Sequence, residues 1–291
     1  MANMIEDTQE QLPFRYIHSW HYDMLINQER SYFYNQMIKD HCKDKVVLEI
    51  GTGSGLMAAL AIKHGAKQVI CCEENPLLAM AAQTFFRRLG IEDKITLFTQ
   101  NSKSIGTHEI PPVDVVLHEL FGSDPFGEEV VPTLSDAKRF MKAEAIFLPE
   151  KIQLMYRPIL QRGLPEKIFF EEFHLREMEL LLSQVHPGLR NKEPDQLSDG
   201  ISSTSYFLPE VSMKELTQTP YQYTENNPKL VDVDAVEVTY LIVHQGKKLQ
   251  AAQFNNETTR VHWYPLVFLK LDVPSGQLRF STKDNVKLMV L

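Results

Sequence analysis

The sequence predicts an α/β protein: a doubly wound parallel sheet followed by a smaller antiparallel, β-barrel-like domain with a helical insertion. Three observations support this. Short apolar runs alternate with amphipathic helical segments through the first half of the chain. The alternation stops at Pro149, and β-rich runs occupy the last third. The 291 residues, 43% of them apolar, can build two such cores.

The elements of the first domain, residues 1–149, follow in a regular order. One or two amphipathic helices are expected over residues 15–38. Strands are predicted at residues 46–50, 68–72, 95–98, 113–117 and 145–148, and helices at residues 56–64, 77–89 and 133–140. This strand–helix rhythm predicts a parallel sheet.

The second domain, residues 150–291, has a different pattern. A helical stretch is expected at residues 166–182, within an insertion near residues 165–200, and a polar loop at residues 187–205. Beyond it, β-rich runs at residues 236–243, 266–271 and 286–291 predict an antiparallel sheet or small barrel.

Composition excludes several classes of function. The net charge is −8, with acids spread along the chain, so no basic field exists to hold nucleic acid. Three cysteines do not make a disulfide framework or a zinc site, and no metal is expected. No basic leader or long apolar span is present, so we expect a cytoplasmic protein that is not a membrane protein.

A glycine-rich turn follows the first strand, in the run Val47-Leu48-Glu49-Ile50-Gly51-Thr52-Gly53-Ser54-Gly55. Such glycines let the backbone approach a ligand and leave helix N-terminal amides free to meet it. The dinucleotide fingerprint would need its third glycine where Leu56 stands. This spacing argues against a nicotinamide-dependent oxidoreductase, which remains an alternative.

The second strand ends in Glu73, 18 residues after Gly55, close to the offset of a ribose-binding acid. With Glu49 two residues before the first glycine, the GxGxG loop resembles the first motif of class I methyltransferases. The resemblance implies S-adenosylmethionine as cofactor. Its contacts would come from Glu49, Gly51, Gly53, Gly55 and Glu73.

Two glutamates follow the fourth strand, Glu119 and Glu128, nine residues apart across a turn that contains Gly122, Pro125 and Gly127. Ligands of open α/β sheets bind beyond the carboxyl ends of the strands. Two carboxylates that converge there imply a cation, a metal or a shared proton. A guanidinium, planar and always charged, suits such a pair.

The segment ELFGSDPFGEEVVP is similar to the double-glutamate loop of protein arginine methyltransferases, especially the type II and III branches. This resemblance extends over nearly the whole chain. It implies transfer of methyl to the guanidinium of arginine, with Glu119 and Glu128 catalytic. Asp124 and Glu129 are taken as solvated loop acids.

Near the N-terminus, the run from Met24 to Arg30 resembles the family's helix that closes over the cofactor. The match implies that Arg30 pairs with the methionine carboxylate and that Met24 packs near the sulfonium. Asn27 stands where the family has Asp. After the third strand, Ser102 occupies the family's adenine-contact position, where a Glu is usual.

Downstream, Val261-His262-Trp263 matches two residues of the family's Thr-His-Trp loop. By this match His262 would be catalytic, holding Glu119 or accepting a proton, and Trp263 would stack on the substrate guanidinium.

The resemblance implies an arginine-containing protein or peptide as substrate and a head-to-tail homodimer formed through the helical insertion. The C-terminal part looks abbreviated, which keeps free arginine or another small guanidine open as the acceptor. A non-catalytic methyltransferase relative that acts as a scaffold is a further alternative.

Overall fold

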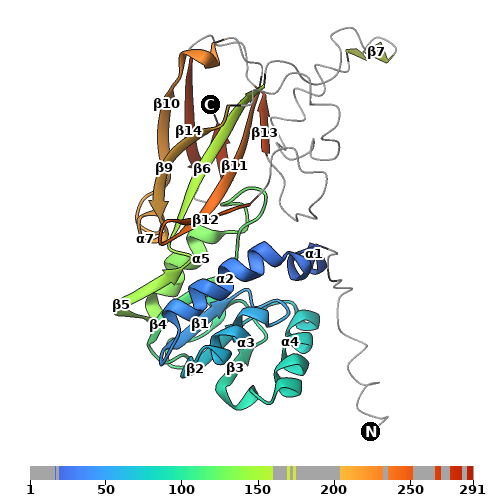
Figure 1. Ribbon diagram of the computed structural model, residues 1–291, viewed down its shortest axis with the longest axis vertical. Coiled ribbons are helices and arrows are strands. Elements are labelled where there is room, and N and C mark those ends of the chain that lie inside the picture. The colour runs from blue at the N-terminus through green and yellow to red at the C-terminus, as the bar shows by residue number, and fades with distance from the viewer. Residues whose placement is uncertain are drawn as a thin grey trace. The chain divides into compact units, whose positions relative to one another are not determined.

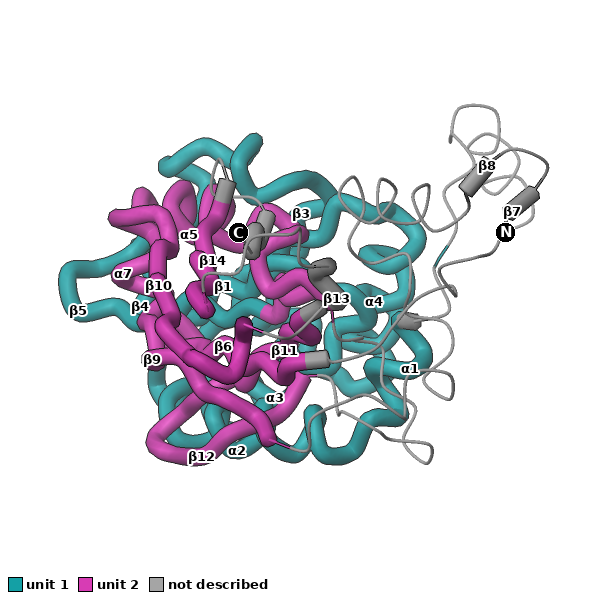
Figure 2. Tube along the Cα trace, turned by 90° about the horizontal axis from the view of Figure 1, so that it is seen from above, with its two compact units in different colours: residues 1–118, 140–146 teal, residues 119–139, 147–291 magenta. Residues whose placement is uncertain are grey.

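The computed structural model describes residues 17, 20–159, 169–170, 173–174, 204–231, 235–251, 266–269, 276–283 and 287–290. The chain forms two compact units, coloured separately in Figure 2. The first comprises Met1–His118 and Phe140–Ile146, and the second comprises Glu119–Arg139 and Phe147–Leu291.

The first unit contains a five-stranded sheet in the order β3-β2-β1-β4-β5 (Figure 1). Its strands are β1 (Val46–Ile50), β2 (Gln68–Cys72), β3 (Ile95–Phe98), β4 (Val113–His118) and β5 (Met141–Leu148). β1 runs parallel to both β2 and β4, and β2 runs parallel to β3. The predicted doubly wound parallel sheet is confirmed.

Two helices precede β1, and two more connect the first three strands. They are α1 (Trp20–Ile26), α2 (Gln28–His41), α3 (Leu56–Lys63) and α4 (Pro76–Leu89), with short 3₁₀ turns at Glu92–Lys94 and Ser102–Ser104. Their ends follow local chemistry. Asn75 caps α4 by accepting from Leu77 N–H at 3.0 Å, and Pro76 occupies the first helical position. Gly90 ends α4 in the left-handed conformation.

The core of the first unit lies along the two central strands. Val47 and Leu48 in β1 and Val116 and Leu117 in β4 are fully buried, as expected for strands with both faces covered. Gly55 brings α3 against α4, because a Cβ there would lie 2.6 Å from the Phe86 ring. Its φ of +87° is a second reason for glycine at this position.

The second unit contains two antiparallel sheets. One has the order β12-β11-β6-β9, with β13 also paired to β11, and the other has the order β10-β14-β15. Their strands are β6 (Lys151–Ile159), β9 (Tyr206–Ser212), β10 (Gln222–Asn226), β11 (Ala235–His244), β12 (Lys247–Gln250), β13 (Leu266–Leu269), β14 (Gln277–Lys283) and β15 (Lys287–Val290). Helical segments are α5 (Val130–Ala137), α7 (Met213–Leu216) and 3₁₀ turns at Lys138–Phe140 and Pro228–Leu230. The predicted antiparallel second part is confirmed.

The long pair β6–β11 organises this unit. In its register Tyr156 faces Val238 and Leu154 faces Tyr240. Because side chains alternate along a strand, Tyr156 and Tyr240 point to the same face of the sheet. Both are fully buried. The aromatic face of β6 and β11 is therefore buried, and the opposite face carries a second buried cluster of Met155, Leu241 and Val243.

Several sequence-based expectations differ from the structure, including β5, which begins at Met141 rather than at residue 145. Residues 166–182 were expected to be helical, but β7 (Phe169–Phe170) and β8 (Phe173–His174) pair as antiparallel strands, so the prediction is wrong at these residues. Aromatic residues favour strands, and this preference outweighs the helical spacing of Phe169 and Phe173. α5 begins at Val130 rather than residue 133, because Pro132 is tolerated in the first turn. The nine-residue strand β6 was not predicted.

The compact units also divide the chain differently from the boundary predicted after Pro149. The second unit resumes at Phe147, but it also takes in Glu119–Arg139, between β4 and β5. Long-range contacts explain this grouping. Ser135 Oγ and Lys138 Nζ both donate to the Thr217 carbonyl, at 3.4 and 3.1 Å. No pattern in residues 119–139 alone signals such partners.

Candidate functional site

The glycine loop between β1 and α3 is held by backbone geometry that only glycine adopts readily. Gly51, Gly53 and Gly55 have φ values of +75°, +57° and +87°. The N–H groups of Gly51 and Thr52 donate to the Cys72 carbonyl at 3.0 and 3.2 Å, which fixes the loop to the end of β2. The sequence-predicted glycines thus form one tight turn at the carboxyl edge of the sheet.

Glu73, at the end of β2, lies directly against this turn. Gly53 N–H donates to its Oε2 and Asn75 N–H donates to its Oε1, both at 2.8 Å. Burial raises the pKa of the Glu73 carboxyl, and the two backbone hydrogen bonds oppose that rise. Each carboxylate oxygen keeps a further lone pair, so the group can accept from two vicinal hydroxyls.

The space above the loop is open. A Cβ at Gly53 would meet no protein atom within 4 Å, although the backbone conformation disfavours any other residue. Open space at Gly53, beside an anchored carboxylate, fits a nucleoside ligand whose sugar lies on Glu73.

Glu49 points into the protein rather than into this space. It is 2% exposed, and the Cys71 thiol donates to its Oε2 at 3.5 Å. Burial raises its pKa to about 7, and hydrogen bonds from Cys71 and Thr52 partly counter this effect. Glu49 therefore braces the start of the glycine loop from below, and the direct cofactor contact predicted for it stays a prediction.

The third strand end also contributes. Ser102 is buried at the start of a 3₁₀ turn that Asn101 caps by accepting from Lys103 N–H at 3.0 Å. Asn101 Nδ2 also donates to Glu74 Oε2 at 2.9 Å, which ties the end of β3 to the end of β2. Ser102 thus lies in a turn linked to the residue next to Glu73, although its adenine contact stays a prediction.

Arg30 and Met24 come from the N-terminal helices of the same unit. Arg30 is 4% exposed, and its guanidinium lies 5.3 Å from the centre of the Tyr34 ring. Met24 is half-buried in α1. Asn27 separates the two helices and caps α2 by accepting from Arg30 N–H at 3.0 Å. A neutral amide performs this capping as well as a carboxylate does.

The glutamate hairpin, Glu119–Glu128, begins where β4 ends and belongs to the second unit. Its turn is built by Asp124, whose Oδ1 accepts from Phe126 N–H at 2.9 Å and whose carbonyl accepts from Gly127 N–H at 3.1 Å. Asp124 is therefore a half-buried turn residue, which corrects its interpretation as a solvated acid.

The hairpin folds Glu128 back toward its beginning. A Cβ at Gly122 would lie 3.3 Å from Glu128 Oε1, so this carboxylate sits beside a residue three positions after Glu119. Glu119 is half-buried and Glu128 is exposed. Partial desolvation raises the pKa of Glu128, but an exposed carboxylate keeps much of its hydration, and we expect it to be ionised at neutral pH.

Sequence reasoning missed several residues that shape the site. Asn75 and Asn101 have local capping signatures that could have revealed them. Tyr240 in β11 and Tyr221 just before β10 contact the hairpin from far along the chain, and they carry no local signal. The predicted His262 and Trp263 lie outside the described residues, and their roles stay predictions.

Within the described ranges, no group of three His, Cys, Asp or Glu side chains could hold a metal ion. In the same part of the chain, no helix has the length and apolar character to cross a membrane.

The fold is that of solved arginine methyltransferases. The Trypanosoma brucei PRMT1 enzyme–prozyme complex with AdoHcy aligns with 91% of this chain and 88% of its own, at a TM-score of 0.70 and 20% identity. PRMT6 aligns with 94% of this chain and 97% of its own, at a TM-score of 0.65 and 17% identity. At these identities the likeness shows the fold alone. The fold therefore groups this chain with proteins that combine a parallel α/β sheet with antiparallel β-sheets.

Curated relatives are closer in sequence. Protein arginine N-methyltransferase 1 of Saccharomyces cerevisiae is 30% identical over 272 residues, which cover 90% of this chain and 70% of that protein. The chain belongs to the protein arginine N-methyltransferase family. Arginine N(omega)-methyltransferase of Streptomyces achromogenes is 32% identical over 152 residues, 51% of this chain but only 42% of that protein's length. No protein-family model matches the chain.

Glu49 makes the stability of the apoprotein depend on pH. The pKa of its carboxyl rises from 4.5 in the unfolded chain to about 7 in the folded protein. The contribution of protonated Glu49 to the free energy of unfolding is therefore fully present below about pH 4.5 and is lost as the pH rises to 7. The change corresponds to about 3 kcal/mol. We expect Glu49→Gln to unfold with a flatter pH dependence over this interval, measured by urea titration at several pH values. Exposed Glu92→Gln is the control, and identical curves for Glu49→Gln and the parent would contradict the assignment.

Proposed function

We propose that this protein is an S-adenosylmethionine-dependent N-methyltransferase that modifies the guanidinium of arginine in a protein or peptide. The paired glutamates of a hairpin that follows β4, in a chain of this family, carry the proposal. The Streptomyces relative and the yeast relative are both named as arginine methyltransferases. The cytoplasmic location expected from the sequence stays a prediction.

The residues of the first unit fit the cofactor. Glu73, held by two backbone donors, would accept the ribose hydroxyls. The open turn at Gly53 would admit the methionine part. By the family match, buried Arg30 would pair with the carboxylate of the cofactor's methionine part. When bound, S-adenosylmethionine supplies an electrophilic methyl group on a sulfonium.

The hairpin carboxylates would act on the acceptor. Charge-assisted hydrogen bonds from a guanidinium to Glu119 and Glu128 localise its positive charge on the bonded nitrogens. The remaining nitrogen would keep more electron density for the transfer: its new N–C bond would form as the S–C bond of the sulfonium breaks and leaves a neutral thioether. The proton on the methylated nitrogen would then be lost to a nearby carboxylate or to solvent. The protein contributes orientation and charge stabilisation rather than a strong base.

Free arginine is the second candidate acceptor. The Streptomyces relative is named for arginine without the word protein, while the yeast relative is named for protein arginine. A peptide and free arginine present the same guanidinium with different surroundings, so an assay with both acceptors separates the two candidates.

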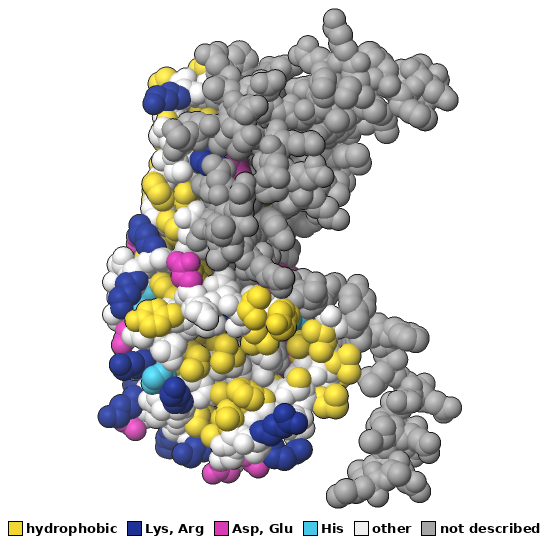
Figure 3. All heavy atoms as spheres, turned by 45° about the vertical axis from the view of Figure 1, so that its right-hand side comes forward, with side chains coloured by type: hydrophobic (Ala, Val, Ile, Leu, Met, Phe, Trp, Pro, Cys, Tyr) yellow, Lys and Arg dark blue, Asp and Glu magenta, His cyan; other side chains and the backbone are white. Residues whose placement is uncertain are grey.

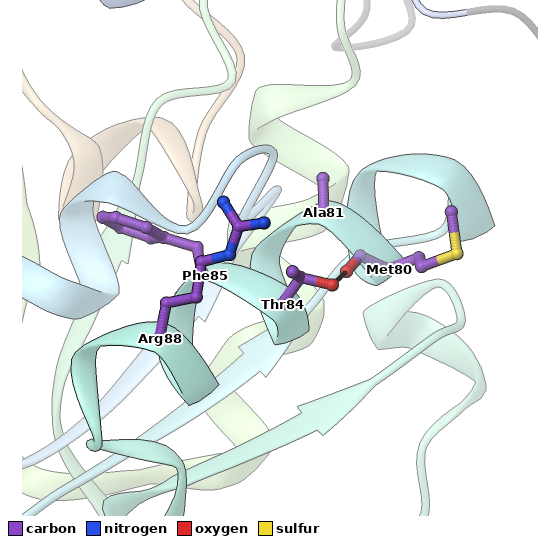
Figure 4. Close-up of a pocket in the computed structure, with 5 residues that line it drawn as sticks. All are labelled: Met80, Ala81, Thr84, Phe85 and Arg88. Atoms are coloured by element: carbon purple, nitrogen blue, oxygen red, sulfur yellow. Dashed lines mark hydrogen bonds between the residues drawn. The ribbon is translucent and has the colours of Figure 1, made fainter.

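We also propose that the protein is a homodimer. The first unit exposes large apolar side chains on α1, α2 and α4: Tyr22, Leu25, Ile26, Tyr32, Met80 and Leu89. Several groups of hydrophobic side chains, drawn in yellow, gather on the lower part of the face in Figure 3. Part of this area is hollowed on α4, between Met80, Phe85 and Arg88 (Figure 4). Such a surface is larger than scattered exposed residues and typical of an interface. The Trypanosoma relative is itself described as an oligomeric complex.

The dimer is tested by charging the interface. Met80 is 61% exposed, so Met80→Glu is tolerated in a monomer but would bury a carboxylate in a dimer. Light scattering after size exclusion should give a dimer for the parent and a monomer for Met80→Glu. Thr107→Glu, at an exposed loop position, should remain dimeric. A parent protein that is monomeric at a concentration of tens of micromolar would contradict the proposed dimer.

Cofactor binding is tested at Glu73. Glu73→Gln removes the charge and presents an amide N–H₂ to a backbone donor, so binding of S-adenosylmethionine should weaken by roughly 10- to 100-fold. Isothermal calorimetry measures it, with Glu92→Gln as a charge-matched control in the same unit. Unchanged affinity for Glu73→Gln would remove Glu73 from the cofactor site.

Catalysis is tested at the hairpin, by mass spectrometry of reactions with an arginine-rich peptide, free arginine and a lysine peptide. Glu128→Gln should lower turnover on the order of a hundredfold, because one electrostatic contact to the transition state is lost, with cofactor affinity retained. The neighbouring Glu129→Gln is the control. Methylation of the lysine peptide alone would refute a guanidinium acceptor, and cofactor binding without any methylated product would favour the scaffold alternative.

A further inference from the structure

The glutamate hairpin is attached to the second unit by a buried tyrosine hydroxyl. Tyr240 lies in the middle of β11 and is fully buried. Its Oη donates to the Gly122 carbonyl at 2.8 Å, across 118 residues of sequence. The Tyr240 ring also packs against Phe121, with centroids 5.7 Å apart and planes at 49°. One side chain thus contacts two consecutive residues of the hairpin.

A second contact holds the far arm of the hairpin. Phe126 is fully buried and stacks on Tyr221, with centroids 5.9 Å apart and planes at 30°. The turn between these two contacts is closed internally by Asp124. The hairpin is therefore held at both arms by ring packing, and the Tyr240 hydroxyl adds a directional bond from β11 to a backbone carbonyl of the hairpin.

Gly122, which carries the bonded carbonyl, lies between the two glutamates of the hairpin in sequence and beside Glu128 in space. Gly122 is three residues after Glu119, and the Glu128 carboxylate lies beside its Cα. Moving this peptide changes the spacing between the two glutamates. A planar guanidinium forms two charge-assisted bonds only when its acceptors are well placed, and misplacement by about 1 Å can cost up to about a hundredfold in rate.

We propose that Tyr240 is a positioning residue for catalysis: its hydroxyl, by holding the Gly122 carbonyl, sets the separation of Glu119 and Glu128. The proposal rests on the methyl transfer proposed above, since it assigns a residue of the second unit to that reaction. Tyr240 would act through the Gly122 carbonyl, without touching the acceptor or the cofactor.

The chain offers a matched control on the neighbouring strand. Tyr156 is also fully buried and points to the same face of the sheet as Tyr240. Its hydroxyl donates to Glu225 Oε1 at 3.2 Å and accepts from Asn227 Nδ2 at 3.1 Å, with no bond to the hairpin. Tyr156→Phe therefore removes a buried hydroxyl from the same core without releasing Gly122.

The experiment compares full-length Tyr240→Phe and Tyr156→Phe. We expect Tyr240→Phe to lower kcat on the order of tenfold, with KM for the acceptor and Kd for S-adenosylmethionine within about twofold of the parent. Tyr156→Phe should keep kcat within about twofold despite an equal or larger fall in Tm. If kcat fell in both variants in proportion to Tm, or stayed unchanged in Tyr240→Phe, the positioning role would be refuted.

Hydrogen–deuterium exchange separates this proposal from the proposed function, because it needs no activity. Peptides covering Glu119–Glu128 should exchange faster in Tyr240→Phe than in the parent or in Tyr156→Phe. Unchanged exchange overturns the anchoring by Tyr240. Faster exchange in a protein whose parent form methylates no guanidine supports the anchoring and refutes the proposed methyl transfer.

Discussion

The bond from Gly53 N–H to the Glu73 carboxylate links the two loops on which the first unit's site depends. One loop leaves β1 and the other leaves β2, and the parallel pairing of these strands brings their carboxyl ends to the same edge. The bond requires a left-handed glycine and a buried carboxylate, each of which is unfavourable alone. Together they offer an open glycine turn and an oriented pair of carboxylate oxygens to one ligand.

The glutamate hairpin is held by contacts with the second unit. Its sequence lies between two strands of the parallel sheet, yet its packing partners are tyrosines of the second unit. Strand β4 therefore sets where the hairpin starts, and the antiparallel sheets set how it is folded. In this family member, the spacing of the proposed catalytic carboxylates is thus coupled to the core of the second unit rather than to the glycine loop.

Several residues that look functional or anomalous in the sequence have structural roles. Asn27 departs from the family's acidic residue, but its side chain caps α2, and either residue type satisfies that need. Asp124 builds the hairpin turn. Glu49 supports the glycine loop from a buried position, next to the Cys71 thiol. Their side chains are oriented by neighbours that no spacing rule identifies.

The sequence by itself determined the strands of the parallel sheet, the glycine turn and the acid at the end of β2. These depend on short apolar runs, on glycine's access to positive φ and on offsets within one βαβ unit, which are all local. The glutamate pair was predicted from its position and spacing, and its catalytic role stays a prediction. Tertiary structure alone decided the pairing of Tyr240 with Gly122, the strand β6 beside β11 and the membership of residues 119–139 in the second unit. These depend on contacts between residues tens to more than a hundred positions apart, whose partners are fixed only when the sheets assemble.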